Sequence, residues 1–259
     1  MQALRIAATG MNAQQLNVDV LSNNIANLNT TGFKQGQAAF SDLIYQNRIG
    51  VGAITSSAGT LAPTGLQIGL GVNIGSVYRI MQQGAINQTS NPLDLAMSGR
   101  GFFRVTMPDG STSYTRDGSF QLNQDGQLVT KDGFTVDPAI TVPTNATDFT
   151  VTNLGIVSAK VDGVVTELGT ITVSMFVNEA GLESLGDNYY RETEASGAAA
   201  DVNPSEDGAG TIRQGALESS NVDAIESITR LITAQRAYEL NSKIITAADQ
   251  MLSTLTQMT

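Results

Sequence analysis

The aspartates that precede glycines are the residues whose type and spacing come nearest to chemistry. Asp-Gly pairs occur at 109–110, 117–118, 125–126 and 132–133, so a carboxylate recurs every seven or eight residues. Two carboxylates brought together could act as a general acid and base, as in an enzyme that cleaves peptidoglycan. Asp-Gly is also the strongest local signal for a tight turn between strands, and the turns explain all four aspartates. We therefore expect no catalytic residue here.

Metal and cofactor chemistry is equally weakly supported. Asn123, Asp125 and Gly126 have offsets that suit a calcium loop, but Gln121 stands at the first ligand position and Asp132 replaces the bidentate Glu at the last. The chain has no His and no Cys, which excludes Ser-His-Asp and Cys-His machinery, the usual zinc sites and any disulfide. We expect no metal site, no cofactor-binding site and a protein that is not an enzyme.

Composition narrows the possible partners. The 259 residues include 24 acidic and 14 basic side chains, a net charge of −10, which disfavours nucleic acid as a partner. No run of about 18 apolar residues could form a membrane helix, so the protein is not expected to be membrane-embedded. The start of the chain does not resemble a secretory signal, which taken alone would indicate the cytoplasm.

The elements that must carry function lie at the two ends. In steps of three and four from Leu4, seven of eight positions are apolar, which predicts a helix with a coiled-coil-like seam, ending near Leu28. Its other face carries amides and hydroxyls with few charges, so it too should be covered by protein; the alternative is one amphipathic helix docked on its own domain. The expected seam residues are Leu4, Met11, Gln14, Val18, Leu21, Ile25 and Leu28.

The last 40 residues return to a helical pattern with two apolar stripes, which predicts more than one packing partner. One stripe advances in steps of three and four and the other in steps of seven. Gln14 and Asn241 interrupt the two seams with amides that could set their register. The expected C-terminal seam residues are Leu231, Ala237, Tyr238, Asn241, Ile244, Ile245, Ala248, Met251, Leu252 and Leu255.

Between the ends, residues 50–75 are rich in glycine and carry no charge, as a flexible linker would. Apolar and small residues nevertheless alternate through that stretch, which predicts an extended arm, a long hairpin, with its apolar strand positions at Leu66, Ile68, Leu70, Val72 and Ile74. Residues 78–215 predict a β-domain, with strands at 149–152, 156–161 and 170–177, a turn at Asp162-Gly163 and a surface loop at 195–210.

The expected fold is therefore α+β: paired terminal helices, an extended β-hairpin arm and one mostly antiparallel β-domain. The expected boundaries are residues 1–32 for the N-terminal helix, 33–77 for the arm, 78–215 for the β-domain and 216–259 for the C-terminal helix.

Several motifs resemble those of bacterial flagellar rod and hook proteins, in the same order and over essentially the whole chain. They include 98–103, 114–120, 125–130, 181–184, 217–222 and 235–239. The N-terminal signature is the most specific of them, and its residues here are Asn23, Asn24, Asn27, Thr30, Gly32, Phe33 and Lys34.

The resemblance implies a structural subunit. The single β-domain favours the rod over the hook, and the opening residues with the glycine-rich arm favour the distal rod over the proximal rod. Such subunits stack helically with their own copies into a hollow drive shaft that transmits torque. The implied partners are proximal rod and hook proteins, and the ring proteins that act as a bushing in the peptidoglycan and outer membrane.

The resemblance also replaces the cytoplasmic expectation, because family members leave the cell through the flagellar type III export apparatus without a cleavable signal. Phe40 and Ile44 resemble the Phe-x-x-x-aliphatic element that engages the export gate, although an ordinary apolar contact of the arm explains them as well. The alternatives left open are a proximal rod protein and a soluble monomeric adaptor with a docked helical pair.

Overall fold

The computed structural model describes residues 2–50, 52 and 64–257, and it divides the chain into two compact units. We call residues 1–25, 36–78 and 224–259 the helix–arm unit, and residues 26–35 and 79–223 the β unit. Residues 26–32 and 216–223, expected with the helices, thus belong to the β unit. The hydrogen bonds made by Gly32 and Glu218, described below, explain that difference.

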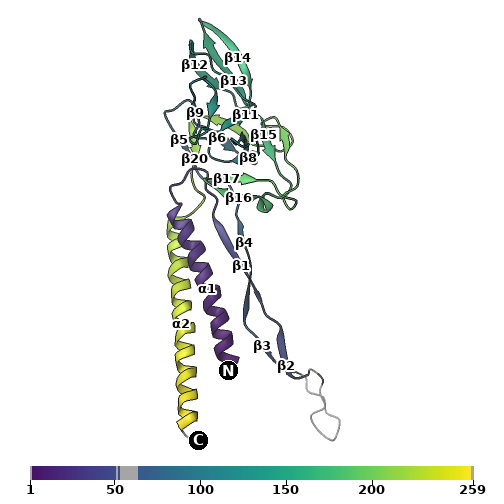
Figure 1. Cartoon of the computed structure of the whole chain (residues 1–259), viewed down its shortest axis with the longest axis vertical. Helices are drawn as coiled ribbons and strands as arrows, with labels where there is room; N and C mark the ends of the chain where they lie inside the picture. Colours follow the sequence, from purple (N-terminus) through teal and green to yellow (C-terminus); the bar gives the residue numbers. More distant parts are fainter. Residues whose placement is uncertain (1, 51, 53–63, 258–259) are drawn as a thin grey trace. The chain divides into compact units, whose positions relative to one another are not determined.

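Two long helices dominate the helix–arm unit. Helix α1 spans Gln2–Ala26 and α2 spans Ala224–Gln257, and they lie side by side and antiparallel (Figure 1). They approach closely where Gly10 faces Asn241, since a Cβ atom added at Gly10 would lie 3.0 Å from the Asn241 amide nitrogen. Helix α1 ends two residues before Leu28, because the chain turns at Asn27, whose carbonyl accepts the amide hydrogen of Thr30.

The arm is a two-stranded ribbon in two sections. Strand β1 (Gly36–Asp42) pairs with β4 (Val72–Arg79), and β2 (Tyr45–Ile49) pairs with β3 (Leu66–Gly69). The single strand expected through residues 66–74 is interrupted at Leu70 and Gly71. Gly71 has a φ of +125°, which side-chain-bearing residues rarely adopt, so the strand breaks there.

The β unit is built mostly of antiparallel strands. Its largest sheet has seven strands in the order β16-β17-β8-β7-β11-β10-β9. These strands are Glu183–Gly186, Tyr189–Arg191, Thr112–Thr115, Phe103–Thr106, Thr135–Asp137, Leu128–Val129 and Gln121–Leu122.

Smaller sheets complete the β unit. A three-stranded sheet has the order β12-β13-β14, and the remaining pairs are β15 with β18, β6 with β19 and β5 with β20. A 3-10 turn at Glu179–Gly181 precedes β16. In chain order these strands are Ile86–Gln88 (β5), Leu95–Ser98 (β6), Ala146–Val151 (β12), Ile156–Val161 (β13), Val164–Thr170 (β14), Val173–Met175 (β15), Ala200–Val202 (β18), Thr211–Gln214 (β19) and Ala216–Glu218 (β20).

Most Asp-Gly pairs form the hairpin turns that the sequence predicted. Those at 109–110, 125–126, 132–133 and 162–163 connect β7 to β8, β9 to β10, β10 to β11 and β13 to β14. The pair at 117–118 does not join a hairpin. It is buried, and a Cβ atom at Gly118 would lie 1.6 Å from the Leu95 carbonyl oxygen, so glycine there permits close backbone packing.

The prediction of a surface loop over residues 195–210 is partly wrong. Residues 200–202 form β18 and pair with β15, with Val202 opposite Val173 and Ala200 opposite Met175. The partner lies some 27 residues earlier in the chain, and non-local pairing overrides the weak β propensity of Ala and Asp.

The core of the described structure lies in the β unit. One cluster gathers aliphatic residues from several sheets around Phe103 and Phe120, whose rings meet edge to face at 5.2 Å. A second is aromatic: Phe102 packs edge to face on both Phe176 and Tyr190. Such pairs contribute beyond their buried area, so this unit holds an interior of its own.

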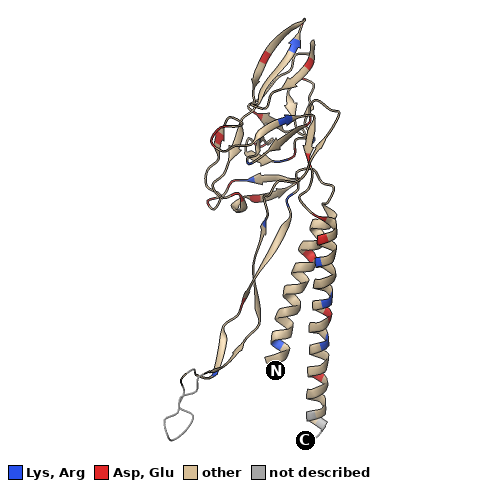
Figure 2. Cartoon of the chain, turned by 180° about the vertical axis from the view of Figure 1, so that it is seen from behind, with Lys and Arg blue, Asp and Glu red and all other residues tan. Residues whose placement is uncertain are grey.

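Charge is divided unequally between the units (Figure 2). The helix–arm unit has five basic and five acidic side chains and is therefore neutral. The β unit has nine basic and nineteen acidic side chains, a difference of −10 that equals the net charge of the whole chain.

Candidate assembly surfaces and the buried signature

The signature residues Gly32, Phe33 and Lys34 lie in the interior of the β unit. Gly32 has a φ of +68° and a Cβ atom there would lie 2.8 Å from the backbone of Arg116, so glycine satisfies both conformation and space. Its amide hydrogen bonds to the carbonyl of Glu218 at 2.8 Å. Phe33 is buried beside Arg79, whose guanidinium lies 5.6 Å from the ring centroid.

A buried ionic cluster joins Lys34, Arg116 and Glu218. Lys34 Nζ lies 2.6 Å from Glu218 Oε1, and the side chains of both are 0% exposed. Arg116 Nη1 lies 3.4 Å from Glu218 Oε2 and donates to the Gly99 carbonyl at 2.9 Å. The single carboxylate of Glu218 thus compensates two buried cations. Lys34 also donates a hydrogen bond to the Gln82 carbonyl, which offsets part of the cost of burying its charge.

Burial governs the protonation of this cluster. Desolvation lowers the pKa of Lys34, which the Glu218 carboxylate opposes and the Arg116 cation reinforces. Desolvation likewise lowers the pKa of Arg116, and Glu218 again opposes it. The sequence placed Lys34 in a signature and gave no role to Arg116 or Glu218. Their burial depends on contacts across 184 residues, a distance over which a sequence pattern gives no signal.

Two asparagines bond the backbone immediately after the signature's end. Asn24, buried in α1, donates to the Gly36 carbonyl and accepts from the Gly36 amide, both at 2.8 Å. Asn221 accepts from the Gln35 amide at 2.8 Å. Consecutive residues therefore have their polar backbone groups satisfied by side-chain amides, which is a physical reason for asparagine in these motifs. The remaining signature positions are half-buried at Asn27 and Thr30 and exposed at Asn23.

The N-terminal seam is only partly covered within one chain. Leu21 is buried, whereas the other expected seam positions are half-buried. Among the most buried residues of α1 are Ala7 and Ala13. Small side chains allow close helix approach, which explains why alanines rather than the larger seam residues are deepest. The half-buried positions are Leu4, Met11, Gln14, Val18, Ile25 and Leu28.

The C-terminal seam divides into covered and open residues. Ala248 is buried, and Leu231, Ala237, Asn241, Ile245 and Leu252 are half-buried, whereas Tyr238, Ile244 and Met251 are exposed. The side chain of Leu255 lies outside the described residues. An open apolar stripe runs along α2, and we call it the α2 stripe. Its residues are Ile225, Ile228, Ile232, Leu240, Ile244 and Met251.

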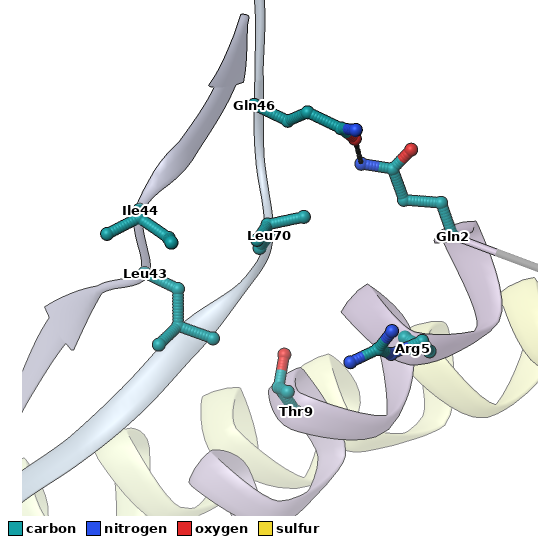
Figure 3. Close-up of a pocket in the computed structure, with 7 residues that line it drawn as sticks. All are labelled: Gln2, Arg5, Thr9, Leu43, Ile44, Gln46 and Leu70. Carbon is teal, nitrogen blue, oxygen red and sulfur yellow. Dashed lines mark hydrogen bonds between the residues drawn. The ribbon is translucent and has the colours of Figure 1, made fainter.

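The Phe40–Ile44 element lies at the bend of the arm. Phe40 is in β1, and Ile44 is 78% exposed between β1 and β2. Ile44 lines a cavity of about 500 Å³ with Leu43 and Leu70 from the arm, and with Gln2, Arg5 and Thr9 from α1 (Figure 3). Its walls are mainly apolar, and Gln2 donates a hydrogen bond to Gln46 across it at 3.4 Å. Both roles proposed for the element, gate contact and arm contact, are compatible with this exposure.

Thr9 connects α1 to the break in the arm. Its hydroxyl donates to the Ile6 carbonyl at 2.8 Å and accepts from the Val72 amide at 3.3 Å. A Cβ atom at Gly71 would lie 2.2 Å from that hydroxyl. Of the expected arm-strand residues, Leu66 and Ile74 are exposed, and Ile68, Leu70 and Val72 are half-buried.

Within the described part of the chain, no group of three or more His, Cys, Asp or Glu could hold a metal ion. No described helix is both long and apolar enough to cross a membrane. Asn123, which fitted the calcium pattern, uses its side-chain oxygen to accept the amides of Asp125 and Gln127 within its own turn.

Three family descriptions match this chain. Residues 4–34 match the flagella basal body rod protein family, residues 96–159 the D1 domain of the flagellar hook protein FlgE/F/G, and residues 213–258 the C-terminal part of the flagellar basal body rod FlgEFG protein. Each match contains one residue of the buried ionic cluster, in the order Lys34, Arg116 and Glu218.

The chain is similar over its full length to curated proteins. The flagellar basal-body rod protein FlgG of Caulobacter vibrioides is 54% identical, over 100% of this chain and 99% of that protein. The protein of the same name from Agrobacterium fabrum is 50% identical, over 98% and 97%. The flagellar hook-basal body complex protein FlhP of Bacillus subtilis is 31% identical, over 97% of each.

Proposed function

The chain belongs to the flagellar basal-body rod protein family, and from that premise we propose that it is a structural subunit of the distal rod. In this proposal it polymerises helically into a hollow, rigid drive shaft that carries torque from the motor to the hook. The family is one of structural proteins, and the sequence similarity to proteins named FlgG is what favours the distal rod.

The α2 stripe is the observation that carries the polymerisation. Its six apolar residues follow steps of three and four, with Arg236 and Ala247 at the two intervening positions, so they form one slowly winding face. Ile225 is 79% exposed and Met251 is 61% exposed. An exposed apolar face of this length, interrupted by one charge at Arg236, is typical of an interaction surface. Because many like subunits stack in a rod, the occupant we propose is another copy of the chain.

The composition of the helix–arm unit supports the same conclusion. It is neutral, so copies can pack without accumulating repulsion between like charges. Its arm is a two-stranded ribbon, which is marginal in water on its own and exposes Ile44, Tyr45, Ile49 and Leu66. Neighbouring copies would cover these side chains.

Localisation and further partners follow from the proposed function. The subunit would leave the cell through the flagellar type III export apparatus without a cleavable signal, with Phe40 and Ile44 as the gate element. In the basal body it would span the periplasm as part of the rod and meet proximal rod proteins, hook proteins and the bushing rings of the peptidoglycan and outer membrane. A proximal rod subunit is the second candidate, since it would share this architecture.

The test places a charge on the α2 stripe. For Ile244→Asp we expect the free energy of unfolding of the isolated chain to lie within about 0.5 kcal/mol of that of the unmodified chain, because the position is already exposed. Assembly should be lost, since a buried unpaired carboxylate would face an apolar neighbour. Electron microscopy of basal bodies, from cells in which the variant replaces the native copy, measures this.

Thr246→Asp is the matched control, because it adds the same charge to an exposed position on another face of α2. Rods of normal length with Thr246→Asp and none with Ile244→Asp support polymerisation through the stripe. Normal rods with both variants would contradict it. A stable monomer that forms no rods even when unmodified would favour the soluble adaptor.

A further inference from the structure

The chain passes between its two units four times, after residues 25, 35, 78 and 223. Three of the segments involved are held against one another, and every atom that holds them belongs to the β unit. These segments are residues 32–35, 79–84 and 218–221. Whatever the arrangement of the units, force carried along the chain at the crossings after residues 35, 78 and 223 runs through these segments.

Asn221 connects all three. Its Oδ1 accepts the Gln35 amide at 2.8 Å, and its Nδ2 donates to the carbonyls of Ile80 at 2.8 Å and Gln82 at 3.0 Å. Ile80 in turn donates its amide to the Gln35 carbonyl at 2.9 Å. Two antiparallel residues normally exchange two backbone hydrogen bonds. Here one bond is direct, and the carboxamide of Asn221 is inserted in place of the other, as an additional peptide group would be.

The buried ionic cluster binds the same segments a second time. Lys34 Nζ donates to Glu218 and to the Gln82 carbonyl, so it contacts the other two segments. The Gly84 amide donates to Glu218 Oε1 at 2.9 Å, and Arg79 Nη1 donates to the Lys34 carbonyl at 3.1 Å. We call Lys34, Gln35, Ile80, Gln82, Glu218 and Asn221 the exit cluster.

We propose that the exit cluster shares mechanical load among the segments by which the chain leaves the β unit, and that Asn221 is its positioning residue. This inference rests on the proposed function, because only a subunit that transmits torque needs such sharing. Separate segments would each stretch under the load that reaches them. Segments bonded laterally act as one element, because movement of one requires breaking hydrogen bonds to the others.

The cluster also differs from what folding alone requires. The Gln35 amide and the Ile80 carbonyl could pair directly, as the Ile80 amide and the Gln35 carbonyl do. Inserting Asn221 adds the C-terminal segment to a contact that two segments could make by themselves. The gain is connection among the three segments.

The first measurement is hydrogen exchange on the full chain carrying Asn221→Ala. Asn87→Ala is the control, since Asn87 also bonds to the C-terminal segment, at Ser219 Oγ, but to neither of the other segments. We expect amide exchange at Gln35 and at residues 80–84 to become faster together, by about tenfold, because removing the Asn221 carboxamide removes the hydrogen bonds that join these segments. Faster exchange at Gln35 alone would overturn the proposal.

The second measurement is mechanical. In cells whose rods contain Asn221→Ala, we expect normal rod number and a loss of swimming speed that grows as the medium is made more viscous. Asn87→Ala cells should match the unmodified strain at each viscosity. If Asn221→Ala gives no rods, mixed rods with the unmodified chain replace them, and speed under load should fall as the variant fraction rises.

Swimming unchanged under load, with rods present, would overturn load sharing and leave the proposed function intact. Failure of the proposed function gives a different result, because the unmodified chain would then be absent from purified rods.

Discussion

The two units of this chain differ in net charge and in how far their apolar residues are buried. The β unit holds the whole net charge, two hydrophobic clusters and the buried ionic cluster. The helix–arm unit is neutral, with a few charges of both signs along its helices (Figure 2), and the residues of the α2 stripe are exposed. We infer from this difference that the β unit is stable within one chain, and we propose that other copies complete the helix–arm unit.

The largest expected effect is the removal of a charge from the exit cluster. Glu218→Gln leaves Lys34 and Arg116 buried without a counter-charge, and should destabilise the β unit by about 3–5 kcal/mol. Chemical denaturation of the isolated chain measures this. Glu226→Gln is the match in the helix–arm unit, where the pair with Arg230 is more than half exposed on both sides, and its effect should be below about 1 kcal/mol.

A second variant separates lost compensation from lost packing. Adding Lys34→Met to Glu218→Gln removes one of the uncompensated cations and should recover part of the stability. If the double variant is less stable than Glu218→Gln, the Lys34 charge is not what Glu218 compensates. Equal effects of Glu218→Gln and Glu226→Gln would remove the distinction between the two units.

Two glycines with nearly the same positive φ provide the next comparison. Gly101 in the β unit has a φ of +126°, and a Cβ atom there would lie 2.0 Å from Val173 Cγ1. Gly71 in the arm has a φ of +125° and faces the Thr9 hydroxyl. Alanine should cost about 1–3 kcal/mol of backbone strain at each. Val173 is fixed in a packed core, so Gly101→Ala should also lower the midpoint of cooperative unfolding.

Gly71→Ala should leave that midpoint unchanged and act on the arm. Circular dichroism during thermal unfolding measures the midpoint. Hydrogen exchange at Val72 measures the effect on the arm, because the Val72 amide donates a hydrogen bond to the Thr9 hydroxyl. A lowered midpoint in Gly71→Ala would show that the arm unfolds together with the β unit.

The sequence predicted those parts of the fold that depend on neighbouring residues. Strand β13 has the boundaries expected for it, and four Asp-Gly turns join the strands around them. The pairing of β5 with β20 and of β6 with β19 joins residues more than a hundred positions apart, and no local pattern marks it. The roles of Arg116, Glu218 and Asn221 could not be predicted for the same reason, because their partners lie far away in the sequence, although the motifs that contain them were identified.

The helices show the same limit in another form. Apolar spacing located both helices and predicted two stripes on α2, but the structure does not separate the helix into those stripes. Ala248, which is buried, and Ile244, which is exposed, belong to the same predicted seam, and four of the six residues of the α2 stripe lie outside the predicted seam. Ala234 and Ala248 are the buried apolar residues of the described part of α2. Small residues set how closely two helices approach, and a pattern of apolar positions does not distinguish alanine from isoleucine. In the proposed rod, another copy would cover the larger exposed residues of α2.

The smallest expected effect is a titration confined to the β unit. Burial raises the pKa of Tyr114, Tyr189 and Tyr190 above the usual value of 10, and the Asp132 carboxylate that accepts from Tyr189 raises its pKa further. Above pH 10 the unfolded chain loses these protons and the folded chain keeps them, so stability is present below pH 10 and falls as pH rises. Each tyrosine contributes a loss of at most about 1.4 kcal/mol per pH unit. Lys34 has the opposite sign below pH 10.5, because its pKa is lowered, and comparing Tyr189→Phe with the unmodified chain cancels it. Denaturation between pH 9 and 11 should show a shallower decline for Tyr189→Phe, and parallel declines would mean that Tyr189 ionises without unfolding the core that encloses it.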